Sequence, residues 1–347
     1  MPDGHLVEAD APLYRPTVLT MDASSTFDDC PGSDGERSPY WVALPRPFYP
    51  RWETSYPMTD DLLESVRRHY EEYGRGFSAL DPDAAVSHWG APSIRMSPDG
   101  VTLDATVEGR RQGFADATER LAATDYDHSD PMGIRAHTLS DSLALSSVVW
   151  ERVTAEEDLI ARFSPLHLLR RADDGWKFTA RASRRSDDPI TMRAVDRGSG
   201  GEERAAGSDA LPEAPEGIEA FFEEYGRAFS TLDGETIAAH WNLPTLVVPP
   251  EDVRAVASTA EVETLFDGLD EELRSRGYDR SEAMEVYAHE LDDGVVAADV
   301  LWHRYAEDGD VIERFAAFHL LLETDDGWKL VVIARHPPEN MVSLAEG

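Results

Sequence analysis

Apolar and aromatic residues recur at spacings of three and four in two segments of the chain, and the two stripes match each other. The stripe runs through Val66, His69, Tyr73, Phe77 and Leu80 in the first segment and through Ile218, Phe221, Tyr225, Phe229 and Leu232 in the second. Such spacing places side chains on one face of a helix. The pattern therefore predicts a long amphipathic helix at the start of each of two similar units.

Shorter elements follow each long helix. A short second helix is predicted to end at Trp89 in the first unit and at Trp241 in the second, because the nearby Pro92 and Pro244 disfavour helical backbone before them. A brief strand and a third helix come next. The strand covers 94–96 and 246–248, and the helix is clearest at Val262, Leu265, Phe266, Leu269 and Leu273.

The remainder of each unit is a succession of strands. Runs in which apolar and polar residues alternate lie near 131–140, 142–154, 158–172 and 175–184, and near 283–292, 294–306, 310–324 and 327–336. Asp-Gly sequences at the joints, such as Asp308-Gly309, supply the positive φ that tight hairpins need. Three helices before a four-stranded antiparallel meander predict an α+β unit that buries one face of its sheet against the helices.

The two units are copies of one another at a constant offset of 152 residues, with no gap. The clearest matching segments are 71–75 with 223–227 and 173–177 with 325–329. A period of this length indicates two globular domains rather than a solenoid. We therefore expect a first domain at 58–185 and a second at 215–340.

Two segments have no counterpart in the other copy. Residues 1–57 are rich in Pro, Asp and Ser and show no sustained period, so an irregular leader is expected. Two interpretations of it stay open: a flexible arm that packs over a domain, or residues upstream of a natural start at Met58. Residues 186–214 are polar and Gly-rich, which predicts a flexible linker.

The charge balance of the chain is extreme. Its 347 residues include 68 acids and 32 cations, which gives a net charge of −36 and a pI near 4.5, and Lys177 and Lys329 are the only lysines. High salt screens repulsion between carboxylates, a device of halophiles, so a halophilic source is expected, with an acidic mesophilic protein as the alternative. So negative a surface argues against binding to nucleic acid or anionic lipid.

Several kinds of site are absent from the sequence. Cys30 is the only cysteine, so no disulfide forms within the chain, and there is no metal-ligand spacing or Gly-rich phosphate loop. No cofactor or metal is therefore expected. The chain has no apolar run of the roughly 20 residues that a membrane span needs, and no secretory signal, so a cytoplasmic location is expected.

Three sequence motifs occur in both copies. The first helix ends in Phe-Ser-x-Leu-Asp at 77–81 and 229–233, His-Trp-x-x-Pro follows at 88–92 and 240–244, and the last hairpin carries Asp-Gly-Trp-Lys. In these motifs the chain resembles the nuclear transport factor 2-like superfamily, which includes SnoaL-like polyketide cyclases and ketosteroid isomerases. The resemblance implies two tandem cone-shaped domains, each with three helices packed on a curved antiparallel four-stranded sheet around a conical pocket. It also implies that the two domains pair through the outer faces of their sheets as an intramolecular pseudo-dimer.

Tyr73 and Tyr225 match the spacing of the tyrosine that donates to the oxyanion in ketosteroid isomerases. At the position of the general-base aspartate of those enzymes, however, this chain carries Ser97 and Pro249. Without that carboxylate a proton next to a carbonyl has no base, so isomerase chemistry of that type is not expected. The alternative role of both tyrosines is that of core aromatics.

Further candidates come from the strands. His167 and His319 lie in the penultimate strand, where a histidine can act as a general base or be a satisfied interior residue. An arginine beside an indole could grip a carboxylate ligand or pair with a surface acid. The candidate pocket residues are Tyr73, Trp89, Trp150, Arg152 and His167 in the first copy, and Tyr225, Trp241, Trp302, Arg304 and His319 in the second.

Two hypotheses for function follow from these residues and the resemblance. In the first, the protein is a non-catalytic module that binds a small apolar or carboxylated ligand or serves in assembly. In the second, it is a SnoaL-like acid–base enzyme (a cyclase, isomerase or dehydratase) acting on a cyclic ketone or polyketide-like substrate. A carboxylate that hydrogen-bonds to His167 or His319 and faces the pocket would favour the enzyme.

Overall fold

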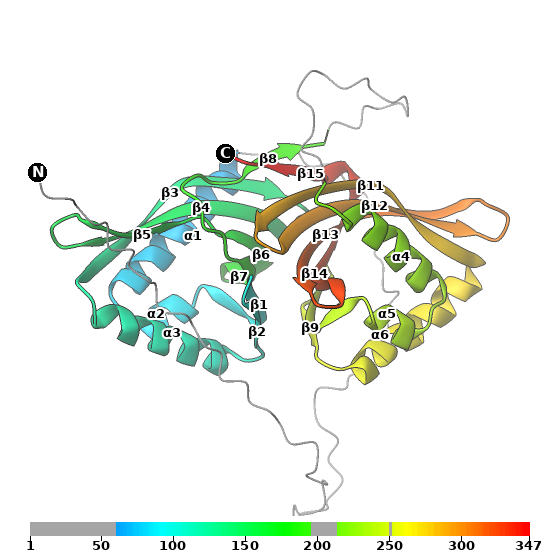
Figure 1. The fold of residues 1–347 in the computed structure, drawn as a ribbon, viewed down its shortest axis with the longest axis horizontal. Coiled ribbons are helices and arrows are strands. Elements are labelled where there is room, and N and C mark those ends of the chain that lie inside the picture. The colour runs from blue at the N-terminus through cyan, green and yellow to red at the C-terminus, as the bar shows by residue number, and fades with distance from the viewer. Residues whose placement is uncertain (1–59, 196–213, 250–251) are drawn as a thin grey trace, which may run out of the picture. The chain divides into compact units, whose positions relative to one another are not determined.

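The computed structural model describes residues 60–195, 214–249 and 252–347 (Figure 1). The predicted leader, 1–57, lies outside the described residues, as does most of the predicted linker, 186–214. Within the described ranges, helices and strands follow the same order in both copies, as the repeat predicts. No helix among the described residues combines the length and the apolar character needed to cross a membrane.

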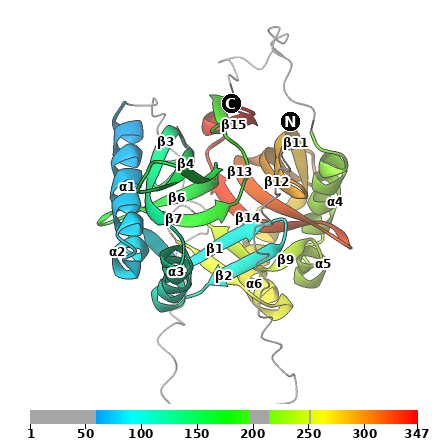
Figure 2. The same cartoon turned by 60° about the vertical axis from the view of Figure 1, so that its left-hand side comes forward.

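The first copy places three helices against one sheet. Its elements are α1 (Asp60–Ser78), α2 (Pro82–Val86), β1 (Trp89–Ser97), β2 (Gly100–Asp104), α3 (Val107–Ala122), β3 (Tyr126–Thr138), β4 (Leu143–Thr154), β5 (Leu159–Phe163), β6 (Leu166–Ala172) and β7 (Gly175–Ala182). The sheet has the order β2-β1-β7-β6-β4-β3, with β5 paired to β4. Helices α1 and α3 lie on one side of it (Figure 2). The predicted α+β architecture is confirmed.

The second copy repeats this arrangement. Its elements are α4 (Ile218–Ser230), α5 (Gly234–Ala238), β9 (Trp241–Val248), β10 (Arg254–Val256), α6 (Thr259–Ser275), β11 (Tyr278–Asp292), β12 (Val295–Ala306), β13 (Val311–Thr324) and β14 (Gly327–His336). Strands β11 to β14 form the predicted antiparallel meander. The sheet is larger than predicted, because β9 adds parallel to β14 and β10 adds antiparallel to β9. This pairing satisfies backbone groups of β14 that would otherwise form an open edge.

The second helices end earlier than the prolines predict. Helix α2 ends at Val86, and Trp89 is already the first residue of β1. The carbonyl oxygen of His88 accepts a hydrogen bond from the N–H of Phe178 on β7, at 2.9 Å. Pairing with the sheet, rather than the following proline, therefore ends the helix.

The Leu-Asp motif is a helix stop followed by a helix start. Leu80 and Leu232 adopt left-handed backbone, with φ of 53° and 54°, a conformation that costs a residue with a Cβ about 1 kcal/mol or more. The side chains of Asp81 and Asp233 then cap α2 and α5 by accepting hydrogen bonds from backbone N–H groups. The motif thus turns the chain sharply between two helices in each copy.

One strand differs between the copies. Strand β13 is continuous, whereas the corresponding stretch of the first copy divides into β5 and β6 at Ser164-Pro165. Proline has no N–H to donate to a ladder, so it interrupts the pairing. Ala317 occupies the equivalent position of the second copy and leaves the ladder intact.

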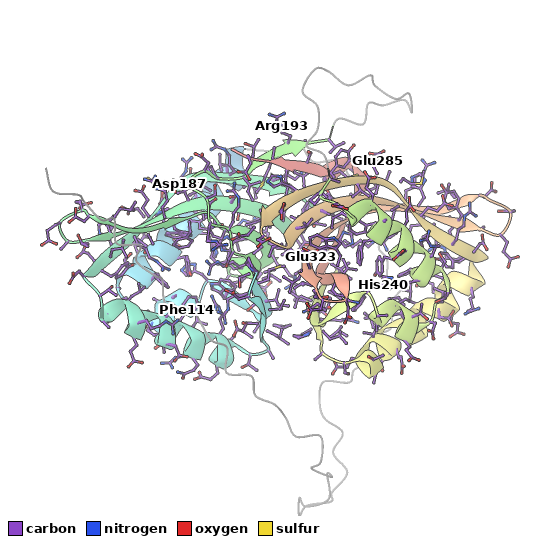
Figure 3. All side chains as sticks on the ribbon, in the orientation of Figure 1. Phe114, Asp187, Arg193, His240, Glu285 and Glu323 are labelled. Carbon is purple, nitrogen blue, oxygen red and sulfur yellow. The ribbon has the colours of Figure 1, made fainter. Side chains whose placement is uncertain are left out.

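Buried apolar side chains form a core inside each copy and a further cluster with members from both. The first core includes Tyr70, Phe114 on the inner side of α3 (Figure 3) and Trp150. The second core includes Phe222 and Trp302. Members of the cluster common to both copies include Leu143, Leu166, Leu168 and Ala180 from the first and Val295, Phe318, Leu320 and Val332 from the second.

After its last sheet strand, each copy continues into a short strand. These strands, β8 (Thr191–Ala194) and β15 (Val342–Ala345), pair antiparallel with each other. A short 3₁₀ turn, η1 (Pro338–Asn340), precedes β15. The predicted flexible linker therefore begins with a paired strand, since the turn-rich sequence around β8 conceals a segment that finds its partner about 150 residues away.

Equivalent residues hold the two segments that lead into these strands. In the first copy, the hydroxyl of Ser147 accepts a hydrogen bond from the N–H of Ile190 at 3.0 Å. In the second, a carboxylate oxygen of Asp299 accepts one from the N–H of Val342 at 2.8 Å, and the other oxygen is 2.9 Å from Nε2 of His336. Each copy thus uses a buried polar side chain of its long central strand to fix the chain that follows it.

Candidate functional site

A cavity of about 110 Å³ lies between the helices and the sheet of the second copy. The predicted residues of that copy all line it: Tyr225, Trp241, Trp302, Arg304 and His319. The rest of the wall is mainly apolar, with Phe266 and Leu269 from α6 and Ile333 from β14. The cavity therefore combines an apolar body with a few polar groups, the usual make-up of a small-molecule site.

A glycine sets the position of Tyr225 above the sheet. A Cβ on the next residue, Gly226, would lie 2.9 Å from the carbonyl oxygen of Ser281 and 3.3 Å from the ring of Trp302. Helix α4 therefore approaches β11 more closely than it could if any residue other than glycine stood at position 226. The indole Nε1 of Trp241 donates to the hydroxyl of Tyr225 at 3.3 Å, which ties β9 to the same helix.

One end of the cavity is charged. Arg304 donates to the carboxylate of Glu313 at 2.7 Å, and Arg335 donates to the other oxygen of the same carboxylate. Burial disfavours the charged form of Glu313, but the two guanidinium groups outweigh it and lower the pKa of the carboxyl. Both guanidinium groups also stack on the ring of Phe315, at 4.8 and 4.1 Å from its centre. The two arginines at this end of the cavity thus have Glu313 as their counter-ion.

His319 is the most buried polar residue of the wall. Its side chain is 1% exposed, and its Nδ1 has no hydrogen-bond partner among the described residues. Burial lowers the pKa of the ring to about 4, so the imidazole is neutral at pH 7. A neutral imidazole has one donor and one acceptor nitrogen, and the nitrogen at Nδ1 is the one without a partner among the described residues.

The equivalent histidine of the first copy is satisfied. Nδ1 of His167 is 2.8 Å from the hydroxyl of Tyr70, which is also 2.7 Å from the hydroxyl of Ser146. The second copy carries Phe222 and Ala298 at the positions of Tyr70 and Ser146, so it lacks both hydroxyl groups. This pair of differences is the reason why only His319 lacks a partner at Nδ1.

The remaining candidates of the first copy pack ring against ring. The ring centres of Tyr73 and Trp150 are 5.7 Å apart, and those of Trp89 and His167 are 6.4 Å apart. The guanidinium of Arg152 lies 4.8 Å from the centre of the Phe163 ring, not on an indole. The predicted residues of this copy thus meet within one aromatic core.

Several residues of these sites were not predicted. Glu313 and Arg335 belong to the second cone but have Ala161 and Ser183 as counterparts in the first copy, and Tyr70 has Phe222. Identity between the copies marks the positions that they share, so it gives no signal for residues that one copy alone carries. The helical stripe was a usable signal for Tyr70, since that position adjoins His69 on the buried face of α1.

Neither histidine has the carboxylate that would mark a general base. In the described part of the chain, no carboxylate hydrogen-bonds to His167 or His319. The buried carboxylate near His319, Asp299, is instead engaged by His336 and by the backbone of Val342. The arrangement can therefore hold a ligand, but it lacks the oriented acid–base pair that proton transfer at a carbon requires.

A family model described as NTF2-like protein (DUF6841) matches residues 63–186 and 213–338. The chain belongs to this family. Its two matched segments are the two copies, so the protein is a tandem NTF2-like protein. The implied cone fold, with helices on one face of a curved sheet, is thereby confirmed. A search of curated proteins finds no match.

Solved structures that resemble the chain each correspond to about one NTF2-like copy. A domain of unknown function with a cystatin-like fold from Nostoc punctiforme is 13% identical over 37% of this chain and 80% of its own length, with a TM-score of 0.31. An NTF2-like protein of unknown function from Shewanella oneidensis is 14% identical over 35% and 96%, with a TM-score of 0.29. Aln2 from a Streptomyces species is 13% identical over 38% and 94%, with a TM-score of 0.32.

Proposed function

We propose that the protein is a non-catalytic binding module whose second cone takes a small, single-ring ligand with one hydrogen-bonding group. The observation that carries this is the unpartnered Nδ1 of His319 in the wall of an otherwise apolar cavity. A buried polar group without a partner costs about 1–3 kcal/mol, which a phenol or cyclic ketone would recover. The volume of about 110 Å³ is close to that of an engineered apolar cavity, about 150 Å³, that binds benzene.

The test compares two ligands of equal shape, phenol and toluene, by isothermal titration calorimetry. Phenol should bind more tightly than toluene, because only its hydroxyl can meet Nδ1 of His319. His319→Phe keeps a ring in the wall and should reduce phenol affinity about tenfold while leaving toluene unchanged. His167→Phe, the matched change in the first copy, should alter neither affinity.

A second variant tests whether the cavity is the site. Ala317 lines the cavity, and Ala317→Ile should fill part of it and weaken both ligands. Binding of phenol that persists unchanged in both His319→Phe and Ala317→Ile would rule out the second cone.

The alternative, a SnoaL-like acid–base enzyme, has less support. It needs a base that a neighbouring carboxylate orients, and the hydrogen bonds of His167 and His319 do not supply one. Ketosteroid-isomerase chemistry also needs an aspartate where the chain has Ser97 and Pro249. Binding without turnover is therefore the function that the site supports best.

We also propose that the two NTF2-like domains pair within the chain in solution. The buried cluster with members from both copies and the β8–β15 pairing support this. A hydrogen bond between Nε2 of His137 and the carbonyl oxygen of Asn340, 2.9 Å long, adds to it. The two halves, produced separately and mixed, should elute together as a complex. Two stable monomers without affinity for each other would contradict the pairing.

A further inference from the structure

Four arginines gather in the first cone. Arg95 and Arg181 are register neighbours on the parallel strands β1 and β7. Arg181 and Arg152 both approach the ring of Phe163, at 5.7 and 4.8 Å from its centre. Arg110 reaches in from α3, with its guanidinium 3.8 Å from the ring centre of Trp89. In a chain with a net charge of −36, this concentration of positive charge in an interior is unexpected.

The carboxylates do not balance these four charges. Asp104 pairs with Arg95 at 3.1 Å and with Arg110 at 3.5 Å. Within the described ranges, neither Arg152 nor Arg181 forms an ion pair. Burial lowers the pKa of Arg110 to about 9 and that of Arg181 to about 10, which reflects the cost of holding charge away from water.

Buried hydrogen-bond donors in the same cone also lack partners. They are Nε of Arg110, Nε of Arg152 and the indole Nε1 of Trp89, none of which has an acceptor among the described residues. Arg110 is 4% exposed, so water does not serve it freely. All three are N–H groups, so the missing partner is an acceptor, and the charge of the arginines favours an anionic one.

The second cone shows what the first one lacks. There, the counterpart of Trp89, Trp241, donates to Tyr225, and the counterpart of Arg152, Arg304, pairs with Glu313. Arg304 and Glu313 are direct neighbours across β12 and β13. The same register in the first copy places Ala161 opposite Arg152. The first cone thus has the arginine of this pair without its carboxylate.

We propose that the first cone binds a small carboxylate ligand, whose charge takes the place that Glu313 fills in the second cone. Its body would be apolar, because aromatic side chains lie against the arginines: the ring centre of Phe77 is 5.4 Å from the guanidinium of Arg152, and that of Phe114 is 4.1 Å from the guanidinium of Arg110. Arg152 and Arg181 would receive the carboxylate, and the aromatic core would contact the apolar body. This site is independent of the cavity around His319.

The test uses the full chain with benzoate as the probe and benzamide, which has the same shape without the charge, as the control. At constant ionic strength, benzoate should raise the melting temperature and benzamide should not, because a ligand that binds only the folded state stabilises it. Calorimetry should give benzoate an affinity at least about tenfold above that of benzamide.

Variants that exchange residues between the copies make the test specific. Arg181→Ile introduces the residue of the second copy, Ile333, and should weaken benzoate about tenfold or more. Ala161→Glu introduces the equivalent of Glu313 as an internal competitor, so it should abolish benzoate binding and raise the melting temperature without ligand. Arg304→Gln, the matched control in the second cone, should leave benzoate binding unchanged.

Three results would overturn this assignment. One is equal binding of benzoate and benzamide by the natural chain. Another is benzoate binding that is lost in Arg304→Gln but kept in Arg181→Ile, which would move the site to the second cone. The third is an Ala161→Glu variant that is less stable than the natural chain and binds benzoate as well as before. Should that variant not fold, Arg181→Ile decides alone.

Discussion

At the scale of single residues, each copy serves as a control for the other. Tyr70 satisfies Nδ1 of His167, whereas Phe222 has no hydroxyl to offer Nδ1 of His319. The two lysines of the chain, by contrast, play the same part in both copies. Nζ of Lys177 donates to the carbonyl oxygen of Ser87 at 2.6 Å, and Nζ of Lys329 donates to that of Ala239 at 2.7 Å. Each lysine thus caps the end of a second helix, a local need that explains its presence in an otherwise lysine-free chain.

Gly226 should be intolerant of a side chain. In Gly226→Ala, the added Cβ would meet the backbone oxygen of Ser281 at 2.9 Å, so α4 must move from the sheet. We expect a loss of about 1–3 kcal/mol in the free energy of unfolding, measured by urea denaturation. Gly268→Ala is the matched control: Gly268 lies on the exposed side of α6 with nothing near its Cβ position, so helix propensity should stabilise it by up to about 1 kcal/mol. Stabilisation by both changes would contradict close packing at Gly226.

His319 should make the protein sensitive to acid. Its pKa is about 4 in the folded protein against an ordinary value of 6.5. Between these values the unfolded chain binds a proton that the folded chain does not, so the free energy of unfolding falls as the pH is lowered from 6.5 towards 4. Denaturation between about pH 7 and pH 4.5 should show a smaller loss for His319→Phe than for the natural chain.

Part of that loss should persist in His319→Phe, because burial also lowers the pKa of His69 and His167. His128 provides the control: its side chain is 29% exposed, and a hydrogen bond to Asp127 raises its pKa. His128→Gln should not reduce the loss of stability in acid. Equal pH profiles for His319→Phe and the natural chain would contradict a neutral buried ring.

The sequence singled out cavity-lining positions that both copies share and missed those that only one copy carries. Tyr225, Trp241 and His319 could be found because each has an identical counterpart, and they do line the cavity. Glu313 could not be found, because its pairing with Arg304 across β12 and β13 depends on register. In the linear sequence it resembles any other surface acid of a very acidic chain.

At the scale of elements, periodicity predicted the long helices and the antiparallel strands, because both patterns are local. The parallel pairing of β9 with β14 could not be predicted, since its partners are far apart in the sequence and few residues specify it. Pro165, which divides β5 from β6, is plain in the sequence. The apolar run around it nevertheless predicts one continuous strand. Long-range pairing, not propensity, thus accounts for most of the differences.

The buried carboxylate of Asp299 should be needed to hold β15. Asp299→Ala would leave the N–H of Val342 and the ring of His336 without their acceptor, and we expect a loss of about 3–5 kcal/mol in stability. Hydrogen exchange at the amide of Val342 should accelerate more than exchange in β13. Ser147→Ala removes the weaker equivalent bond to Ile190 and should cost about 1 kcal/mol. Unchanged exchange at Val342 would show that packing alone holds the strand.

At the scale of the whole molecule, charge should govern stability. With 68 acids against 32 cations, repulsion between exposed carboxylates is strong at low salt and declines as the Debye length shortens to about 3 Å at 1 M. Thermal denaturation followed by circular dichroism should move to higher temperature as KCl rises from about 0.1 M to about 3 M. A melting temperature that does not change over this range would contradict adaptation to high salt.

The exchange of Ala161 for Glu313 at equivalent positions has a consequence for how such a protein can evolve. Alanine and glutamate codons can differ by a single base, so a carboxylate opposite Arg152 lies one mutational step from the present sequence. A duplicated domain lets one copy take that step while the other preserves the ancestral chemistry. Selection can then tune two binding specificities within one polypeptide, because the unchanged copy keeps the original specificity while the other one changes.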